Sequence, residues 1–278
     1  MKTVAFHTLG CKVNTYETEA MQQLMESAGY RCVEFTERAD VYIVNTCSVT
    51  NIADRKSRQM LHRARKMNED AIVVAAGCYV ESAKNKIDED LSIDIIVGNN
   101  NKNDIVNIIN KYLQDKIKNK FIIDINKETE YEEFNIRKIN DHTRAFIKVQ
   151  DGCNQFCSYC IIPFTRGRVR SRKMENIIDE VKSLSASGYK EIVLTGIHLS
   201  SYGVDFLDES YNKRMEKLTQ TEESDEEFVT KNELLCLIEN IANIEGIERV
   251  RIGSLEPRII QENFIKSLSK IDKFCPDF

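Results

Sequence analysis

The sequence lacks any run of about 18 apolar residues, the length from which a membrane-spanning helix is expected. Its first residues, Met-Lys-Thr-Val-Ala-Phe-His, lead directly into a strand-like stretch and lack the pattern of a secretory signal. An excess of positive charge is also missing, because the formal net charge is −5. We therefore expect a cytoplasmic protein with neither a signal peptide nor a contact to a membrane. With 278 residues, the chain is long enough for two domains and a substantial core.

Cysteine, in contrast, is plentiful, with nine residues. In a cytosolic chain, such a number indicates metal binding or catalysis rather than disulfides. Cys153, Cys157 and Cys160 have the spacing C-x3-C-x2-C, which suits three corners of an iron–sulfur cube. Without a fourth cysteine nearby, one iron would keep the open position that a reactive centre needs. The alternative is a zinc knuckle or a group of reduced thiols, although neither His nor a fourth Cys follows at knuckle spacing.

Three upstream cysteines share a different pattern. Cys11, Cys47 and Cys78 each follow a short apolar stretch that is typical of a buried parallel strand. Ligands bind at the carboxyl edge of such sheets, where these cysteines would meet. The sequence therefore predicts a second cluster with three cysteine ligands and an open iron. The alternative is three unrelated thiols in the core.

The order of elements predicts an α/β protein. Strand-like and helical stretches alternate up to about residue 128, with helices expected at 15–29, 51–68 and near 101–117. A polar stretch at 126–142 is a candidate linker. Strands at 144–149, 191–196 and 249–254 then alternate with helices near 174–187 and 232–244. This second β/α repeat places the C-x3-C-x2-C loop after its first strand, at the end where barrel active sites lie.

The segments around the cysteines resemble the methylthiotransferase family of radical S-adenosylmethionine enzymes. They are Thr8-Leu-Gly-Cys11-Lys-Val-Asn14, Val44-Asn-Thr-Cys47-Ser-Val-Thr50, Ala76-Gly-Cys78 and the stretch from Val149 to Arg168. Within the family, Ala53-Asp-Arg-Lys-Ser57 and Leu194-Thr-Gly-Ile-His198 are similar to the branch that modifies N6-threonylcarbamoyladenosine in tRNA. The sister branches act on isopentenyladenosine in tRNA and on an aspartate of a ribosomal protein, and they resemble this chain less.

The resemblance implies an N-terminal methylthiotransferase domain at 1–128 and a radical S-adenosylmethionine domain, an incomplete (β/α) barrel, at 129–278. It implies two [4Fe–4S] clusters: a catalytic one on Cys153, Cys157 and Cys160, and an auxiliary one on Cys11, Cys47 and Cys78. S-adenosylmethionine would bind the catalytic cluster and yield a 5′-deoxyadenosyl radical. The implied reaction adds a methylthio group to carbon-2 of the modified adenosine at position 37 of the tRNA anticodon loop. A flavodoxin or ferredoxin would supply electrons.

Two further residues are candidate contacts to S-adenosylmethionine. Tyr159 stands just before the last cluster ligand and would pack against the adenine, with core filling as the alternative. Glu256 follows a predicted strand and would bond the ribose. Its alternative role is helix entry before Pro257.

Basic residues gather directly after the cluster loop. Clustered arginines are the electrostatic footprint of nucleic-acid binding. We predict such contacts for Arg166, Arg168, Arg170 and Arg172. The alternatives are that some of them hold the carboxylate of S-adenosylmethionine or support the barrel. A second basic run, 55–66, is equally explained as the solvated face of a helix.

Two features depart from an average family member. The chain ends at Phe278 after about half of the strands that the family's partial barrel has, and the family's carboxy-terminal RNA-binding domain is missing. We therefore expect a truncated chain, which leaves a non-catalytic iron–sulfur protein as an alternative. The acidic segment at about 205–231 looks like an inserted solvated loop. Cys32 and Cys236 are expected to be packing thiols, and Cys275 is unassigned.

Overall fold

The computed structural model describes residues 1–83, 86–134, 136, 144–206, 232–253, 255–256 and 262–276, without the side chain of residue 119. The chain divides into two compact units. Residues 1–136 and 154–168 form the first unit, and residues 137–153 and 169–278 form the second. Most of the predicted acidic insertion, residues 207–231, lies outside the described residues. No helix within the described part of the chain is long and apolar enough to cross a membrane.

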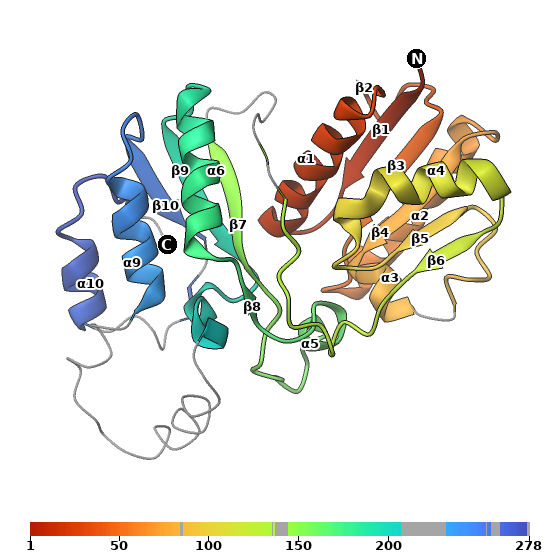
Figure 1. Ribbon diagram of the computed structural model, residues 1–278. Coiled ribbons are helices and arrows are strands. Elements are labelled where there is room, and N and C mark those ends of the chain that lie inside the picture. Colours follow the sequence, from red (N-terminus) through yellow and green to blue (C-terminus); the bar gives the residue numbers. More distant parts are fainter. Residues whose placement is uncertain are drawn as a thin grey trace. The chain divides into compact units, whose positions relative to one another are not determined.

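The first unit is built on a parallel sheet of six strands in the order β2-β1-β3-β4-β5-β6 (Figure 1). The strands are β1 (Thr3–Thr8), β2 (Arg31–Val33), β3 (Val41–Thr46), β4 (Ile72–Gly77), β5 (Ile95–Val97) and β6 (Asn119–Phe121). Every residue of the central strands β3 and β4 is buried. Continuous apolar runs of this kind form strands that are covered on both faces, because a parallel sheet needs crossover helices that pack on it.

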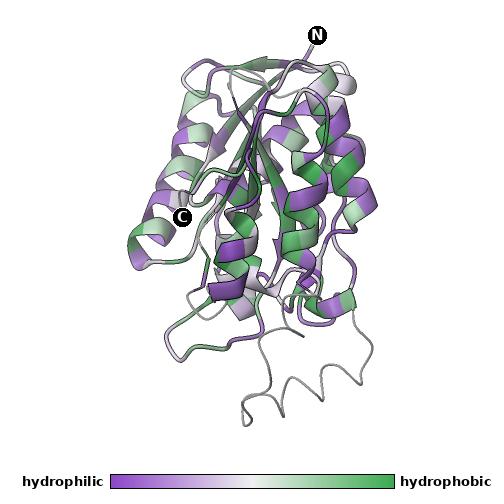
Figure 2. Cartoon of the chain, turned by 90° about the vertical axis from the view of Figure 1, so that its left-hand side faces the viewer, coloured by the Kyte–Doolittle hydropathy of each residue, from purple (hydrophilic) through white to green (hydrophobic). Residues whose placement is uncertain are grey.

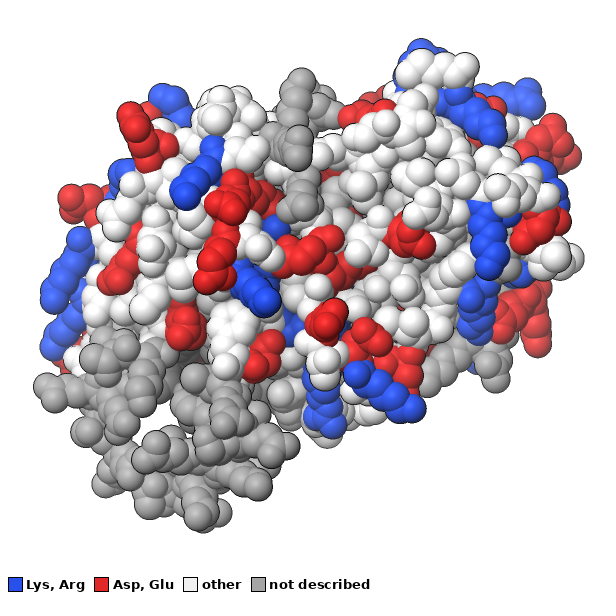
Figure 3. All heavy atoms as spheres, in the orientation of Figure 1, with Lys and Arg blue, Asp and Glu red and all other residues white. Residues whose placement is uncertain are grey.

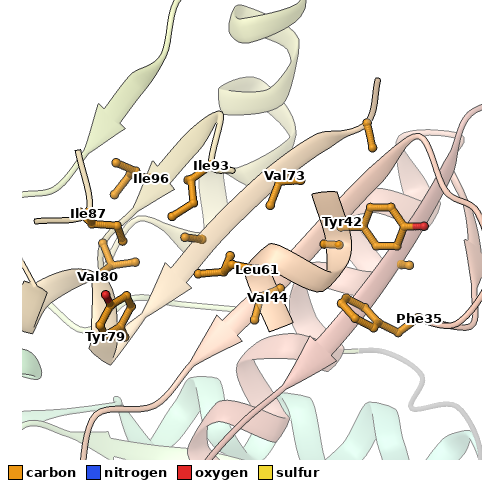
Figure 4. Packing of buried hydrophobic residues seen from close by; sticks show 14 of the residues in the cluster. Phe35, Tyr42, Val44, Leu61, Val73, Tyr79, Val80, Ile87, Ile93 and Ile96 are labelled. Atoms are coloured by element: carbon orange, nitrogen blue, oxygen red, sulfur yellow. The ribbon is translucent and has the colours of Figure 1, made fainter. Parts of the chain in front are cut away.

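Helices cover both faces of this sheet. On one face, α1 (Lys12–Ser27) and α4 (Ile105–Asp115), which follows the short η1 (Lys102–Asp104), contribute Met21, Met25 and Ile108 to a core with β1, β3, β4 and β5. On the other face, α2 (Asn51–Met67) and α3 (Cys78–Ala83) pack Leu61 and Tyr79 against the sheet (Figure 4). The chain enters α2 at Thr50, whose side chain accepts a hydrogen bond from the backbone N–H of Ala53. α5 (Ile162–Thr165) also belongs to this unit.

The second unit has a sheet in the order β10-β9-β7-β8. β7 (Ala145–Asp151), β9 (Glu191–Gly196) and β10 (Arg249–Ile252) are parallel, and the two-residue β8 (Arg170–Ser171) is antiparallel to β7. The helices are α6 (Met174–Ala186), α9 (Glu233–Ala242) and α10 (Glu262–Leu268), with the short η2 (Leu199–Ser201) and η3 (Val204–Phe206). Hydrophobic and hydrophilic residues alternate along the helices in Figure 2. This pattern is expected for helices that pack one face against a sheet and expose the other.

The prediction of an α/β protein with an N-terminal parallel sheet and a second β/α sheet is confirmed. The predicted domain boundary near residue 128 stays a prediction, and the compact units divide the chain differently, because residues 154–168 pack with the first unit. Acidic and basic side chains are interspersed over the face of the molecule that Figure 3 shows.

Candidate functional site

Cys11, Cys47 and Cys78 lie at the carboxyl edge of the first sheet. Cys47 follows the last residue of β3, Cys78 follows the last residue of β4, and Cys11 stands three residues after β1. These three strands are neighbours, and Thr46 pairs with Gly77 directly before two of the cysteines. Cys47 and Cys78 are buried, whereas Cys11 is exposed. Strand pairing thus brings three thiols from distant parts of the sequence to one edge, as the sequence predicts.

Gly10 makes room for the sulfur of Cys47. Its φ of +99° lies in the left-handed region that side chains other than glycine rarely adopt. A Cβ at this position would stand 2.8 Å from the Cys47 Sγ, closer than a real Cβ contact. Burial raises the pKa of the Cys47 thiol, and the neighbouring Cys78 and Cys11 sulfurs raise it further.

Polar side chains fix the loops that carry these cysteines. The Asn14 amide donates to the carbonyls of Leu9 and Thr46, at 2.6 and 2.9 Å. The Thr46 hydroxyl donates to Ala76 and accepts from the backbone N–H of Tyr79. The Ser57 hydroxyl, from α2, both donates to and accepts from the Cys47 backbone. The bonds of Asn14 and Thr46 thus cross-link the starts of the loops after β1, β3 and β4.

The three cysteines are suitable ligands for an iron–sulfur cluster, because thiolate is the usual ligand of such clusters. The space that Gly10 leaves open accommodates the Cys47 sulfur. Among the residues that the structure describes, no group of three His, Cys, Asp or Glu side chains is already gathered as metal ligands. Cys11, Cys47 and Cys78 stay the predicted ligands of the auxiliary cluster. Cys32 does not join them, because it pairs with Val4 near the amino end of β1. Burial, with help from Glu26, also raises the pKa of its thiol to about 12.

In the second unit, a buried polar network fixes the end of β7 just before Cys153. The side-chain amide of Gln150 donates to the carbonyls of Asp151 and Gly152, both at 2.8 Å, and its oxygen accepts from the backbone N–H of His198 at 2.7 Å. Asp151 forms a buried ion pair with Lys148 at 2.7 Å. The register of β7 against β9 shifts between Lys148 and Gln150. Gln150, which the sequence analysis missed, therefore connects the loops after β7 and β9.

Two cysteines of the C-x3-C-x2-C motif, Cys157 and Cys160, belong to the first unit, whereas Cys153 belongs to the second. The backbone N–H of Cys160 donates to the carbonyl of Cys157 at 2.9 Å, which closes a tight turn. Phe156, before this turn, has a positive φ of 46° and packs edge-on against Phe164. The three cysteines stay the predicted ligands of the catalytic cluster.

The two predicted S-adenosylmethionine contacts differ in their surroundings. The side chain of Tyr159 is 92% exposed, which excludes the core-filling alternative. The backbone N–H of Glu256 donates to the hydroxyl of Ser200 at 3.1 Å, which places Glu256 beside the segment after β9. Cofactor binding by both residues stays a prediction.

The four predicted nucleic-acid arginines separate into two groups. Arg166, Arg170 and Arg172 have 0% exposed surface. Arg166 pairs with Glu17, Arg170 with Asp151 and Arg172 with Glu180. The prediction that these three arginines bind phosphates is therefore wrong, because their guanidinium groups are buried in ion pairs. The pair of Arg166 lies in the first unit, and those of Arg170 and Arg172 lie in the second. Arg168 is exposed and lies 4.4 Å from the centre of the Phe156 ring. The phosphate-binding prediction stays open for Arg168 alone.

Arg166 takes part in a buried network that the sequence analysis missed. The Glu17 carboxylate, on α1, accepts from both Arg166 and Lys102. Lys102 also donates to the Asn99 side-chain oxygen at 2.8 Å. Asn99 and Lys102 come shortly after β5, so the edge rule that located Cys47 and Cys78 could have found them. Glu17 lies inside α1, where the sequence carries no comparable signal.

We expect Glu17→Gln to destabilise the first unit by about 3–5 kcal/mol, because it leaves two buried cations without their shared carboxylate. The measurement is urea unfolding at pH 8. Glu19→Gln, on the same helix, is the matched control. Burial raises the pKa of Glu19 to about 7 from its ordinary 4.5. At a pH above about 7, the charged Glu19 carboxylate therefore lowers the free energy of unfolding. The control is expected to be neutral or stabilising at pH 8. An equal loss in both variants would contradict the account.

Comparisons with known proteins find two sequence models that match parts of the chain. Residues 3–98 match the sequence model described as "Uncharacterized protein family UPF0004", and residues 147–221 match that of the "Radical SAM superfamily". The chain is 40% identical over 273 residues to the threonylcarbamoyladenosine tRNA methylthiotransferase MtaB of Bacillus subtilis. It is 36% identical over 275 residues to MtaB of Aquifex aeolicus. A tRNA-2-methylthio-N(6)-dimethylallyladenosine synthase of Clostridium botulinum is 34% identical over 279 residues.

These alignments cover 98%, 99% and 96% of the chain but only 56%, 61% and 56% of the relatives, so the chain spans little more than half of their length. A solved structure of the radical S-adenosylmethionine methyltransferase TsrM from Kitasatospora setae, with tryptophan and an S-adenosylmethionine analogue, matches in fold. Its TM-score is 0.53 at 14% identity, over 98% of this chain and 66% of that one. The chain thus contains segments that match both sequence models, and it is similar over nearly its whole length to tRNA methylthiotransferases.

Proposed function

We propose that this chain provides the two cluster sites of a tRNA methylthiotransferase that converts N6-threonylcarbamoyladenosine at position 37 to its 2-methylthio derivative. The observation that carries the proposal is the placement of Cys11, Cys47 and Cys78 at the ends of three adjacent strands, in a chain that also contains the C-x3-C-x2-C motif. A simple radical S-adenosylmethionine enzyme needs only the second set. The first set supports a second [4Fe–4S] cluster and thus a reaction that inserts sulfur.

The residues have separate tasks in this proposal. Cys153, Cys157 and Cys160 would hold the catalytic cluster, which with bound S-adenosylmethionine and one electron supplies a 5′-deoxyadenosyl radical. Cys11, Cys47 and Cys78 would hold the auxiliary cluster. Gln150 and Asp151 fix the backbone before Cys153, and exposed Tyr159 is available to stack on the adenine. A protein of the flavodoxin or ferredoxin class would be the electron donor.

The test is mass spectrometry of tRNA nucleosides from a strain that lacks the gene. The proposal predicts loss of 2-methylthio-N6-threonylcarbamoyladenosine, accumulation of the unmethylthiolated nucleoside and recovery when the gene is returned. The C. botulinum relative supports a second candidate, methylthiolation of N6-dimethylallyladenosine. Loss of that methylthio nucleoside instead would establish the second candidate. If both methylthio nucleosides persist, tRNA methylthiolation by this protein is contradicted.

Arg168 gives a prediction about tRNA binding. We expect Arg168→Ala to weaken binding of unmodified tRNA and to reduce the slope of log affinity against log salt by about one, because one phosphate contact is lost. Filter binding at several salt concentrations measures both quantities. Lys190→Ala is the control, because Lys190 is an exposed cation that precedes β9, at the amino end of that strand. Equal affinities and slopes for the two variants would remove Arg168 from the tRNA interface.

A further inference from the structure

The Arg166 guanidinium contacts the sulfur of an auxiliary-site cysteine. Its Nε–H donates to the Cys78 Sγ at 3.3 Å. Arg166 comes six residues after Cys160. The segment that follows the catalytic motif therefore supplies a hydrogen bond to a predicted ligand of the auxiliary cluster. Both residues lie in the first unit, because residues 154–168 pack with it.

Every other polar group of the Arg166 side chain is held in place. One terminal nitrogen pairs with Glu17 at 2.5 Å, and the other donates to the side-chain oxygen of Asn14 and to Glu17. Glu17 is 1% exposed and is shared with Lys102. A planar guanidinium with all three nitrogens engaged cannot rotate away from Cys78 without breaking several charge-assisted bonds. The direction of the Nε–H is therefore fixed by the fold.

Asn99 supports the same arrangement from a second side. Its amide donates to the backbone carbonyl of Thr165, next to Arg166, at 2.7 Å, and lies 3.8 Å from the Cys78 Sγ. Its backbone N–H donates to the buried Glu81 carboxylate at 2.7 Å. Cys78 is therefore surrounded by donors that are themselves anchored, one of which carries a full positive charge. Hydrogen-bond donors and a positive charge beside a ligand sulfur favour a more negative cluster.

We propose that Arg166 is a positioning residue whose hydrogen bond to the Cys78 sulfur raises the reduction potential of the auxiliary cluster. Hydrogen bonds to ligand sulfurs and nearby charge are among the factors that set such potentials. A cation beside Cys78 favours the reduced form, because reduction adds negative charge. The inference rests on the proposed auxiliary cluster but not on the identity of the tRNA substrate.

The test uses the chain with Cys153, Cys157 and Cys160 all replaced by alanine, so that the auxiliary site is the only one of the two left. After anaerobic reconstitution, iron is counted and the potential is measured by redox titration with electron paramagnetic resonance. Arg166→Met and Arg166→Lys are compared in this background. We expect Arg166→Met to make reduction less favourable by about tenfold, which corresponds to about 59 mV for one electron. Arg166→Lys should shift the potential in the same direction by less, because it keeps the charge but loses the Nε–H.

The outcomes separate this inference from the proposed function. If the triple-alanine chain binds no iron, the proposed auxiliary cluster fails and the inference fails with it. If all chains hold about four irons and both Arg166 variants keep the parent potential, the auxiliary cluster stands and the inference is wrong. If only Arg166→Met loses its iron, a lowered potential in Arg166→Lys supports the inference, and an unchanged potential contradicts it. If neither variant holds iron, Arg166 serves folding of the unit, and its role in setting the potential is rejected.

Discussion

Replacing Cys157 by alanine is expected to reduce formation of 5′-deoxyadenosine from S-adenosylmethionine to the background of the assay. Cys157 is one of three predicted ligands of the catalytic cluster, and two thiolates do not retain a cube that three hold with one open iron. Bound iron should fall from about eight to about four per chain, because the auxiliary cysteines are untouched. The measurement is an iron and sulfide count together with chromatography of the nucleoside products under anaerobic reduction.

Cys236→Ala is the matched control for this substitution. Cys236 lies on α9, and burial raises the pKa of its thiol, which disfavours the thiolate that a metal ligand needs. The control should retain all of the iron and any cleavage of S-adenosylmethionine that the parent chain performs. If Cys157→Ala kept about eight irons, Cys157 would not be a ligand, and the catalytic cysteine assignment would be wrong.

The second large effect is expected from Gly10→Ala. The added Cβ would stand 2.8 Å from the Cys47 Sγ, so the sulfur must leave the position that the glycine opens. The positive φ adds a backbone cost of roughly 1–2 kcal/mol. We expect loss of the auxiliary cluster, about four irons per chain, with the catalytic cluster retained.

Gly29→Ala separates the two causes. Gly29 has a φ of +89°, and an added Cβ would meet no atom within 4 Å. It therefore carries the backbone cost without the collision. Urea unfolding should show a comparable backbone cost in both variants, but only Gly10→Ala should lose iron. If both variants kept about eight irons, Cys47 would not ligate a cluster in the position that the structure gives it.

The placement of Cys47 and Cys78 at the sheet edge could be predicted from the sequence, because it follows from short local patterns. Cys47 and Cys78 each follow a β-branched, apolar strand, and parallel strands end along one edge. Pattern and topology thus located these thiols without knowledge of any contact. The strands β2 and β6 were missed because they are short and polar at their first residues, whereas the equally short β5 is wholly apolar.

The arginines show where such reasoning stops. The density of positive charge at 166–173 predicted an exposed nucleic-acid surface, but Arg166 is buried against Glu17 and Cys78, which stand 149 and 88 residues earlier. Lys102 is buried by the same carboxylate, 85 residues away. A charge count contains no information about partners at such distances. Only the fold can show whether a cation faces solvent or a buried carboxylate.

The most direct test of the central claim is anaerobic reconstitution of the unmodified chain, with counts of iron and sulfide and an assay for 5′-deoxyadenosine. Two three-cysteine sites predict about eight irons per chain. Formation of 5′-deoxyadenosine would add a working radical centre. About eight irons without cleavage would confirm the ligands and place the missing requirement for chemistry elsewhere. About four irons or fewer would contradict the two-cluster account and return Cys11, Cys47 and Cys78 to the role of ordinary thiols.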